Sequence, residues 1–455
     1  MQSVLFAILL SAGPFAVLAH GFAGAGSTIT GLLLATPIAA LLLLARWREF
    51  RPDICDVLFV LFCCGIALSF AVNGIAAPKE AALLGLSLAA YPAIRVSSRC
   101  GQVPQAFVVV TGAIVAVGAV VTLVALLGQW NDHHGKPLVF DEYDAAPAQF
   151  TTSLGLLLLA LACTELNWRR TAWISILAAV PLVIFAASMV RYSFIVIVVA
   201  LLAAMLVAKA GQRKFIAVIV CVTIASVALG AVVRSSTTLR FAKLAEAALG
   251  FQVAEPGNDE SPAPPVSPPA SALPAPAASG RIATEAAPPV SPPPSQASCP
   301  SIDLDNSIII RQQLYKDAFA LLPEAGLTGL GLDGFTQRSC LKGFQVHNSI
   351  LQAIIEFGWP AGIFLILLLY HAMGTRMLSL ARINREARFV LCSLVFTLML
   401  SMAHGRISRD VALFLFLGYA AKLRSSALDI EEQAWVDGPI NAIPVPGVGA
   451  RLTAA

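Results

Sequence analysis

The sequence predicts an all-α, polytopic membrane helical bundle of about twelve transmembrane helices with one large loop outside the membrane. Of its 455 residues 58% are hydrophobic and only 12% are charged, and apolar stretches long enough to cross a bilayer recur along the chain. Soluble domains carry about 25% charged residues. A soluble enzyme and a disordered chain are therefore excluded. The net charge of +4 is dispersed over short loops, which also argues against a nucleic-acid partner.

The apolar stretches define the expected membrane helices. The first has no basic residue before its apolar core, as a signal peptide would, so we expect it to remain as a membrane helix. Three of the stretches, including the last, are short for a crossing. Within a few residues, the stretches lie at 2–20, 28–45, 55–73, 80–94, 105–127, 150–164, 170–187, 192–209, 214–233, 346–371, 388–403 and 409–422.

The charges of the loops predict the orientation. With the N-terminus inside, the cytoplasmic loops would carry sixteen Lys and Arg residues and the short outer loops five. Because cytoplasmic loops are enriched in basic residues, both termini are expected in the cytoplasm. The expected organisation is nine transmembrane helices in 1–233, an extracytoplasmic loop over 234–345, three helices in 346–422 and a cytoplasmic tail over 423–455.

The outer loop has two unlike parts. Residues 256–300 contain fourteen of the 28 prolines, so we expect an extended, disordered spacer there. Residues 301–345 are instead expected to form a helical, catalytic segment. A helix over 308–322 has one apolar face, Pro323 follows it, and a glycine-rich stretch then returns to the membrane. No strand precedes those glycines, so a nucleotide-binding loop is not indicated.

Polar residues open the tenth expected span. On a continuous helix Asn348, Gln352 and Glu356 would share one face, with His347 beside it. Ionisable groups at membrane depth usually face a water-filled cavity or the bundle interior. Pro360 would remove the hydrogen bond that the Glu356 carbonyl accepts and so kink the helix. The stripe could form a functional site, or interhelical hydrogen bonds that only aid packing.

Four arginines are expected at the outer face. Arg191 lies between two apolar helices in a loop too short to hide it, and Arg311 begins the extracytoplasmic helix. Arg406 and Arg409 lie in a short outer loop, against the general distribution of charge. Each could bind a substrate or be an ordinary surface or snorkelling charge. The histidine pair at 133–134 lacks the spacing of a metal site and indicates only a solvated loop.

Several short motifs in the same regions resemble the bacterial O-antigen ligase and O-antigen polymerase superfamily. An arginine also stands in a Ser-x2-Arg-x-Ser context at 188–193. Two departures are a Val-Arg-Tyr sequence at 190–192, where family members often have Ser-Arg-Gly, and the proline-rich insertion. The motifs are Arg311-x3-Tyr315-x2-Ala318, Gly329-x-Gly331-x2-Gly334-Phe335, His347-Asn348-x2-Leu351 and Glu356-x-Gly358-x2-Ala361-Gly362.

The resemblance implies a GT-C-like membrane glycosyltransferase of the bacterial inner membrane, without cofactor or metal. It would transfer a glycan from an undecaprenyl diphosphate carrier to an acceptor hydroxyl on the outer face. Arg191 and Arg311 are the candidates for stabilising the diphosphate, and His347 is the candidate base. We expect these three to converge on one cavity. The expected substrate-binding residues are Asn348, Gln352, Glu356, Arg406 and Arg409.

The acceptor stays open at this level. A ligase would use lipid A-core, a polymerase another lipid-linked glycan, and a protein O-oligosaccharyltransferase a protein hydroxyl. The opposing class is a secondary transporter, which usually shows interrupted helices in both halves of the chain. The sequence has one polar helix, late in the chain, and no matching helix early.

The cysteines predict one disulfide. Of nine cysteines only Cys299 and Cys340 fall in the outer loop, while the others lie in expected spans or on the cytoplasmic side. Disulfides persist in oxidising compartments outside the cytoplasm. We therefore expect Cys299 and Cys340 to pair and to close the loop that contains Arg311.

Overall fold

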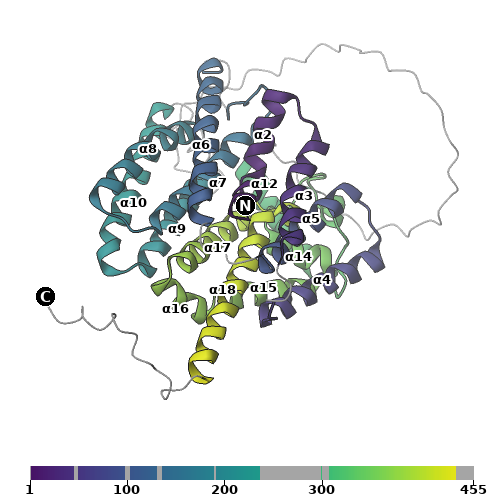
Figure 1. Ribbon diagram of the computed structural model, residues 1–455. Coiled ribbons are helices and arrows are strands. Elements are labelled where there is room, and N and C mark those ends of the chain that lie inside the picture. The colour runs from purple at the N-terminus through teal and green to yellow at the C-terminus, as the bar shows by residue number, and fades with distance from the viewer. Residues whose placement is uncertain are drawn as a thin grey trace, which may run out of the picture.

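The computed structural model describes residues 2–45, 50–97, 103–130, 136–188, 191–235, 299 and 307–436. Throughout these ranges the regular elements are helices, apart from one isolated bridge between Val139 and Tyr143. Helices α8, α9 and α10 form one flank, α3, α4 and α5 form another, and the C-terminal helices lie between them (Figure 1). The all-helical prediction is confirmed.

The helices before the long loop follow the expected apolar stretches closely. They are α1 (Gln2–Leu10), α2 (Ala12–Ala23), α3 (Ser27–Leu43), α4 (Ile54–Asn73), α5 (Pro78–Arg95), α6 (Val103–Gly128), α7 (Ala146–Ala162), α8 (Trp168–Ala187), α9 (Arg191–Val207) and α10 (Ala210–Val233).

The later helices begin with the extracytoplasmic segment predicted from the sequence. They are α12 (Ser307–Leu321), the 3-10 turn η2 (Leu322–Ala325), α13 (Gly334–Arg338), α14 (Ser349–Phe357), α15 (Trp359–Met373), α16 (Thr375–Ile383), α17 (Arg385–Ala403), η3 (Ile407–Arg409) and α18 (Val411–Val436). The last helix continues well into the region predicted as a tail.

The polytopic membrane class is confirmed, but the count of about twelve spans is not reached by helix length and hydropathy. In the described ranges six helices are long and apolar enough to cross a membrane, or seven if the bent pair α1–α2 is one span. The stretch at 80–94 lies in α5, which also contains Lys79, Glu80 and Arg95. Three apolar helices are shorter than a usual span: Gly31–Leu43, Ala146–Ala162 and Tyr192–Val207.

Two expected spans are interrupted. The first bends by 72° between α1 and α2. The tenth was expected to be one helix over 346–371, and that expectation is wrong: α14 ends at Phe357, and α15 begins at Trp359 with Pro360 in its first turn. Between them Gly358 adopts φ +92°, where a Cβ would lie 2.3 Å from the Leu327 carbonyl oxygen. The close approach of the glycine-rich loop therefore requires glycine at this break.

The same loop satisfies backbone groups at the end of α14. The Glu356 carbonyl, expected from the sequence to be a free acceptor, accepts hydrogen bonds from Gly331 N–H and the Ser69 hydroxyl, each at 3.0 Å. Leu330 N–H donates to the carbonyl of Ile355 at 2.9 Å. Gly329, at φ +70°, passes so close that a Cβ would lie 2.3 Å from the Glu356 carbonyl. The break in the helix thus becomes the docking point of the extracytoplasmic segment.

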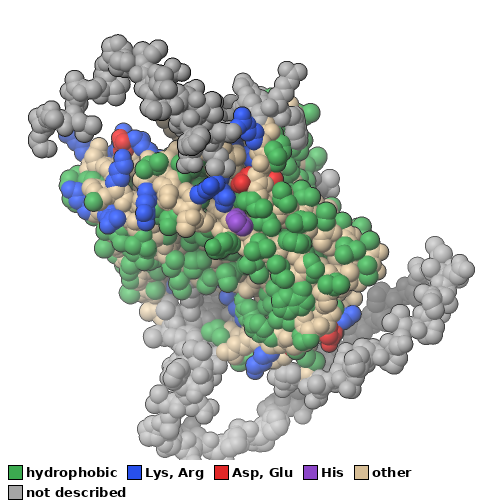
Figure 2. Space-filling view, turned by 90° about the horizontal axis from the view of Figure 1, so that it is seen from below, with side chains coloured by type: hydrophobic (Ala, Val, Ile, Leu, Met, Phe, Trp, Pro, Cys, Tyr) green, Lys and Arg blue, Asp and Glu red, His purple; other side chains and the backbone are tan. Residues whose placement is uncertain are grey.

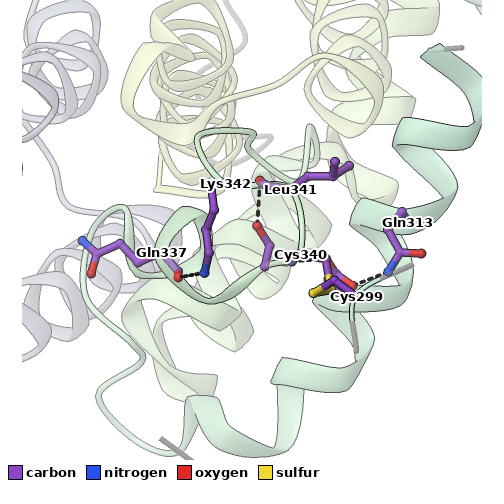
Figure 3. The surroundings of a disulfide bond; sticks show 8 residues. Cys299, Gln313, Gln337, Cys340, Leu341 and Lys342 are labelled. Carbon is purple, nitrogen blue, oxygen red and sulfur yellow. Dashed lines mark hydrogen bonds between the residues drawn. A yellow bond between two sulfur atoms is a disulfide. The ribbon is translucent and has the colours of Figure 1, made fainter. Parts of the chain in front are cut away.

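The outer segment has its own small core and a disulfide. Leu314 and Ala318 of α12 are fully buried against Phe335 and its neighbours. The predicted bond between Cys299 and Cys340 is present, and it lies alongside α12 (Figure 3). Cys340 N–H also donates to the Asp317 carboxylate at 2.8 Å. The disulfide joins Cys299, at the end of the spacer, to Cys340, and the hydrogen bond joins Cys340 to α12.

The membrane helices bury aromatic side chains inside and expose aliphatic ones outside. Phe62 stacks on Phe414, with 5.9 Å between ring centroids, and both are fully buried. Leu177 and Leu206 are examples of the exposed apolar side chains, at 69% and 74% exposure. Hydrophobic side chains dominate the central and right-hand parts of the face seen in Figure 2, and Lys and Arg lie mostly in its upper-left part and next to a histidine. This distribution is typical of a lipid-facing surface.

Candidate active site

The site is built where α12 meets the end of α17. Arg311 of α12 has its Nη2 atom 3.1 Å from Nε2 of His404, which caps α17. A guanidinium has no acceptor, so Nε2 of His404 must accept this hydrogen bond. The ring is then neutral with its proton on Nδ1. Burial and the nearby charge of Arg311 lower the pKa of His404 to about 4, which keeps this tautomer uncharged at neutral pH.

Two tyrosines hold the neighbouring helices to the same point. The Tyr192 hydroxyl, at the start of α9, donates to the Met399 carbonyl at 3.1 Å, and its ring lies 5.3 Å from that of His404. The Tyr315 hydroxyl of α12 donates to the Met402 carbonyl at 3.0 Å. Both bonds use carbonyls near the C-terminal end of α17, and Met402 is one of the last four residues, whose carbonyls have no partner within the helix. They fix α9 and α12 around His404.

His347 lies beside this cluster but not on a helix. It has φ +55°, a left-handed conformation that is strained for a residue with a side chain. The helix begins two residues later, at Ser349, because the Asn348 side chain caps it by accepting from Leu351 N–H at 3.0 Å. We expected Asn348, Gln352 and Glu356 to share one face of a continuous helix, with His347 beside it. This expectation is wrong for Asn348 and His347, because both residues precede the first helical residue, Ser349.

The charges near His347 hold it neutral. Burial lowers its pKa, and the positive charges of Arg311 and Arg406 lower it further. Both arginines are therefore close enough to affect the ring. Burial also lowers the pKa of Arg311, but a guanidinium stays charged in proteins. The structure thus brings together a charged arginine and two neutral histidines.

The third residue of the expected trio is only partly placed. Arg191 begins α9, next to Tyr192, but its side chain lies outside the described residues. The histidine pair at 133–134 also lies outside them. Arg311 lies near enough to His347 to affect its charge. The convergence of all three residues on one cavity remains a prediction.

Arg406 and Arg409 form ion pairs that the sequence did not reveal. Glu80 of α5 lies between them: Arg409 Nη2 is 2.7 Å from one of its carboxylate oxygens and Arg406 Nε is 3.3 Å from the other. Arg406 Nη2 also lies 2.8 Å from the Asp333 carboxylate. The Ser408 hydroxyl donates to Glu80 at 2.7 Å. These contacts explain how two arginines are retained in a short outer loop.

The rest of the polar stripe is buried. Gln352 and Glu356 are 1% and 0% exposed. The Gln352 amide donates to Glu356 at 3.0 Å and to Gln345 at 3.2 Å, and its oxygen accepts from Ile407 N–H at 3.0 Å. These hydrogen bonds join α14 to the loop that contains Arg406, as the packing interpretation predicts. Across the described residues, no three His, Cys, Asp or Glu side chains are grouped so that they could hold a metal ion.

The fold and the site define a polytopic helical membrane protein with a cationic, histidine-containing centre at one end of its bundle. Residues 154–366 match the model of the O-antigen ligase family, and this match confirms the resemblance noted in the motifs of the chain. Members of this family carry out glycan transfer of the O-antigen ligase or polymerase type in surface polysaccharide biosynthesis. The match includes Arg311 and His347, whereas His404 lies beyond it. No curated protein matches the chain.

Proposed function

We propose that this protein transfers a glycan from an undecaprenyl diphosphate carrier to an acceptor hydroxyl at the outer face of the bacterial inner membrane, as an O-antigen ligase. The observation that best supports this is the grouping of Arg311 with the neutral rings of His404 and His347. The proposal includes a GT-C-like bundle of twelve crossings with both termini in the cytoplasm. It places the loop over 234–345 outside, with 256–300 as spacer and 301–345 as catalytic segment.

Arg311 is proposed to bind the departing diphosphate. Negative charge grows on that group as the bond between the anomeric carbon and the phosphate oxygen breaks. A guanidinium can stabilise this charge with paired hydrogen bonds, and more strongly in a partly dry site. His404 engages one of its N–H groups and so sets the direction of the side chain. In the proposal Arg191 adds a second positive charge from the start of α9.

His347 is proposed as the base. The acceptor hydroxyl gives its proton to the ring as its oxygen bonds to the anomeric carbon, and the bonding electrons leave with the diphosphate. The base must be neutral before the reaction, and the lowered pKa of His347 meets this requirement. Asn348 fixes the backbone beside it by capping α14. The reaction proposed here needs no metal.

The surrounding polar residues have supporting roles in this proposal. Arg406 is fixed by Glu80 and Asp333 and helps to keep His347 neutral. Arg409, whose side chain is 54% exposed, remains able to contact a substrate. Gln352 and Glu356 are proposed to hold the frame of the site, since their buried contacts join α14 to the neighbouring loop.

Deletion of the protein in its host, followed by gel analysis of surface polysaccharide, tests the proposal. A ligase predicts that full-length polymer disappears from lipid A-core and accumulates on its carrier. Single-repeat products would identify a polymerase, and loss of glycan from proteins would identify a protein O-oligosaccharyltransferase. Unchanged polysaccharide and unchanged glycoproteins would contradict glycan transfer altogether and leave transport as the class to test.

A further inference from the structure

A cavity of about 300 Å³ lies between α16 and α18, at the other end of α17 from the Arg311–His404 pair. Ile383 lines the cavity just before α17 begins, and His404 caps the far end of that helix. At 1.5 Å per residue a helix of 19 residues is about 28 Å long. The cavity is therefore separate from the proposed catalytic centre.

Hydrogen-bond donors are concentrated in the wall of this cavity. Thr375 and Ser379, one turn apart on α16, contribute hydroxyl groups, and Arg376 and Arg424 contribute guanidinium groups. Of the described residues that line the cavity, none is Asp or Glu. Guanidinium and hydroxyl groups can surround a phosphate with hydrogen bonds, and those from the guanidinium groups are charge-assisted. The wall therefore favours an anionic ligand over a cation.

Arg424 is fixed in place, yet part of its guanidinium is left without a partner. Its side chain is only 7% exposed. Nη1 donates to the His371 carbonyl, and Nε lies 3.5 Å from the Asp53 carboxylate. Nη2 makes no hydrogen bond to any residue that the structure describes. Asp53 offsets one positive charge, so the charge of Arg376 remains for a ligand.

The N-terminus of α16 adjoins the same cavity. The helix begins at Thr375, and Gly374 before it has no side chain that could cap it. Leu378 N–H, which donates to the Gly374 carbonyl at 3.1 Å, is the first amide of the helix with a helical partner. The first-turn amides and the positive end of the helix dipole therefore lie where Thr375 and Arg376 line the cavity.

The surroundings favour a lipid headgroup over a free anion. Ile383, which lines the cavity, is 74% exposed, and Leu378 on the same helix is 39% exposed. Together α15 and α16 make a candidate membrane span over Trp359–Ile383, along which apolar side chains as far as Tyr370 are exposed. A cationic pocket that adjoins exposed apolar surface at the end of a span is typical of phospholipid binding.

We propose that this cavity binds the headgroup of an anionic phospholipid, such as phosphatidylglycerol, as a structural ligand. The phosphate contacts Arg376, Arg424 and the first turn of α16, and the acyl chains lie along the exposed apolar side chains of α15. This lipid neither donates nor accepts a glycan, so the inference stands separately from the proposed function. In the proposed orientation the cavity faces the cytoplasm, on the side of the leaflet whose anionic lipids attract basic segments.

The test is native mass spectrometry of the purified full chain in maltoside micelles, titrated with phosphatidylglycerol or with phosphatidylcholine of the same acyl chains. Both probes have a phosphate diester, but the choline cation cancels the charge of the second. We expect about tenfold tighter binding of phosphatidylglycerol, because its charge is not offset. Glycerol 3-phosphate is the soluble probe, and it should bind at least about tenfold more weakly because it has no acyl chains.

Substitutions locate the binding. Arg376→Gln with Ser379→Ala should weaken phosphatidylglycerol binding by about tenfold or more, because a charge-assisted hydrogen bond is lost. Arg382→Gln is the matched control, since Arg382 is an exposed arginine of the same helix that does not line the cavity. Ala427→Phe should reduce binding by filling the cavity from α18, with every charge retained. Arg424 is kept in all variants, because its contacts hold α18 in place.

Three results would overturn the proposal. They are equal affinity for phosphatidylglycerol and phosphatidylcholine, a loss in Arg376→Gln/Ser379→Ala no greater than that in Arg382→Gln, and binding of glycerol 3-phosphate as tight as that of phosphatidylglycerol. The first would show that the net charge of the lipid is not recognised. The second would place the binding on a general basic surface, and the third would identify a soluble phosphate compound as the ligand.

Discussion

Arg311 and His404, 93 residues apart in the sequence, are joined by a hydrogen bond of 3.1 Å between Nη2 and Nε2. The pair connects the extracytoplasmic segment to the membrane bundle at the end of α17. It also requires a neutral histidine, because only an unprotonated Nε2 can accept from a guanidinium. His404 is therefore a positioning residue, acting on the proposed diphosphate site through Arg311.

Substitution of His404 tests this role. His404→Gln retains a side-chain acceptor for Arg311, whereas His404→Phe removes it. We expect roughly 10- to 100-fold slower glycan transfer in the phenylalanine variant, since a hydrogen bond to a charged group contributes about 1.5–3 kcal/mol. The glutamine variant should retain most of the activity. Transfer rates of the purified variants, at equal abundance, measure the difference. Equal rates for the two would show that the acceptor is irrelevant.

The pH dependence of transfer reports His347. Its pKa is lowered from 6.5 by burial and by two arginines, so the ring stays neutral to a lower pH than a free histidine. More than half of the full transfer rate should therefore remain at pH 6.5, and the rate should reach half of its maximum only below that value. The pKa of His404 is lower, at about 4, so its protonation would come later. A rate that is already half lost above pH 6.5 would contradict the assignment.

The glycine-rich loop gives a structural prediction. Gly329→Ala places a Cβ 2.3 Å from the Glu356 carbonyl at φ +70°, so it should shift the loop away from α14. Gly343→Ala is the matched control, because Gly343 has φ +81° and nothing within 4 Å of its Cβ position. We expect a cost of about 1–2 kcal/mol for the control from its backbone alone and a larger cost for Gly329→Ala. Thermal unfolding in detergent measures both, and equal midpoints would argue against the close contact.

The fold could be predicted from the sequence wherever one local property decides the structure. The lengths of the apolar stretches predicted the ends of α4 and α10 to within a few residues. The distribution of the cysteines predicted the disulfide. Helix length and hydropathy reach the count of about twelve spans only in part, because three apolar helices are short and α5 includes charged residues. The tenth span was predicted as one continuous helix, but the helix breaks at Gly358. The cause is a close contact between Gly358 and the backbone of Leu327, which a local sequence pattern does not reveal.

The site was harder to predict than the fold because its contacts are distant in sequence. The sequence could name Arg311 and His347 as candidates, since their motifs are local. His404 was missed: a single histidine at a helix end gives no signal until Arg311 is placed against it. The sequence placed Glu80 at the start of an expected span. Its role in pairing with both Arg406 and Arg409 becomes visible only in the structure. The Asn348 cap could have been found, because asparagine often begins a helix.

The two parts of the outer loop should differ in importance. Removal of 258–296 should leave transfer nearly unchanged, since a spacer contributes no chemistry. Cys340→Ser should instead destabilise the segment with Arg311, because the disulfide closes a separation of 41 residues, worth roughly 3–4 kcal/mol in the chain-entropy model. Limited proteolysis and transfer assays measure both changes. A spacer deletion as harmful as the cysteine substitution would show that the spacer has a function of its own.

The most direct test of the account is glycan transfer by purified His347→Ala, with His371→Ala as control. His371 lies in the last turn of α15, away from the proposed centre. Loss of a base should slow transfer by about 10²- to 10⁴-fold, with insertion and abundance unchanged. The control should transfer at the wild-type rate. Wild-type transfer by a folded His347→Ala variant would contradict the central claim.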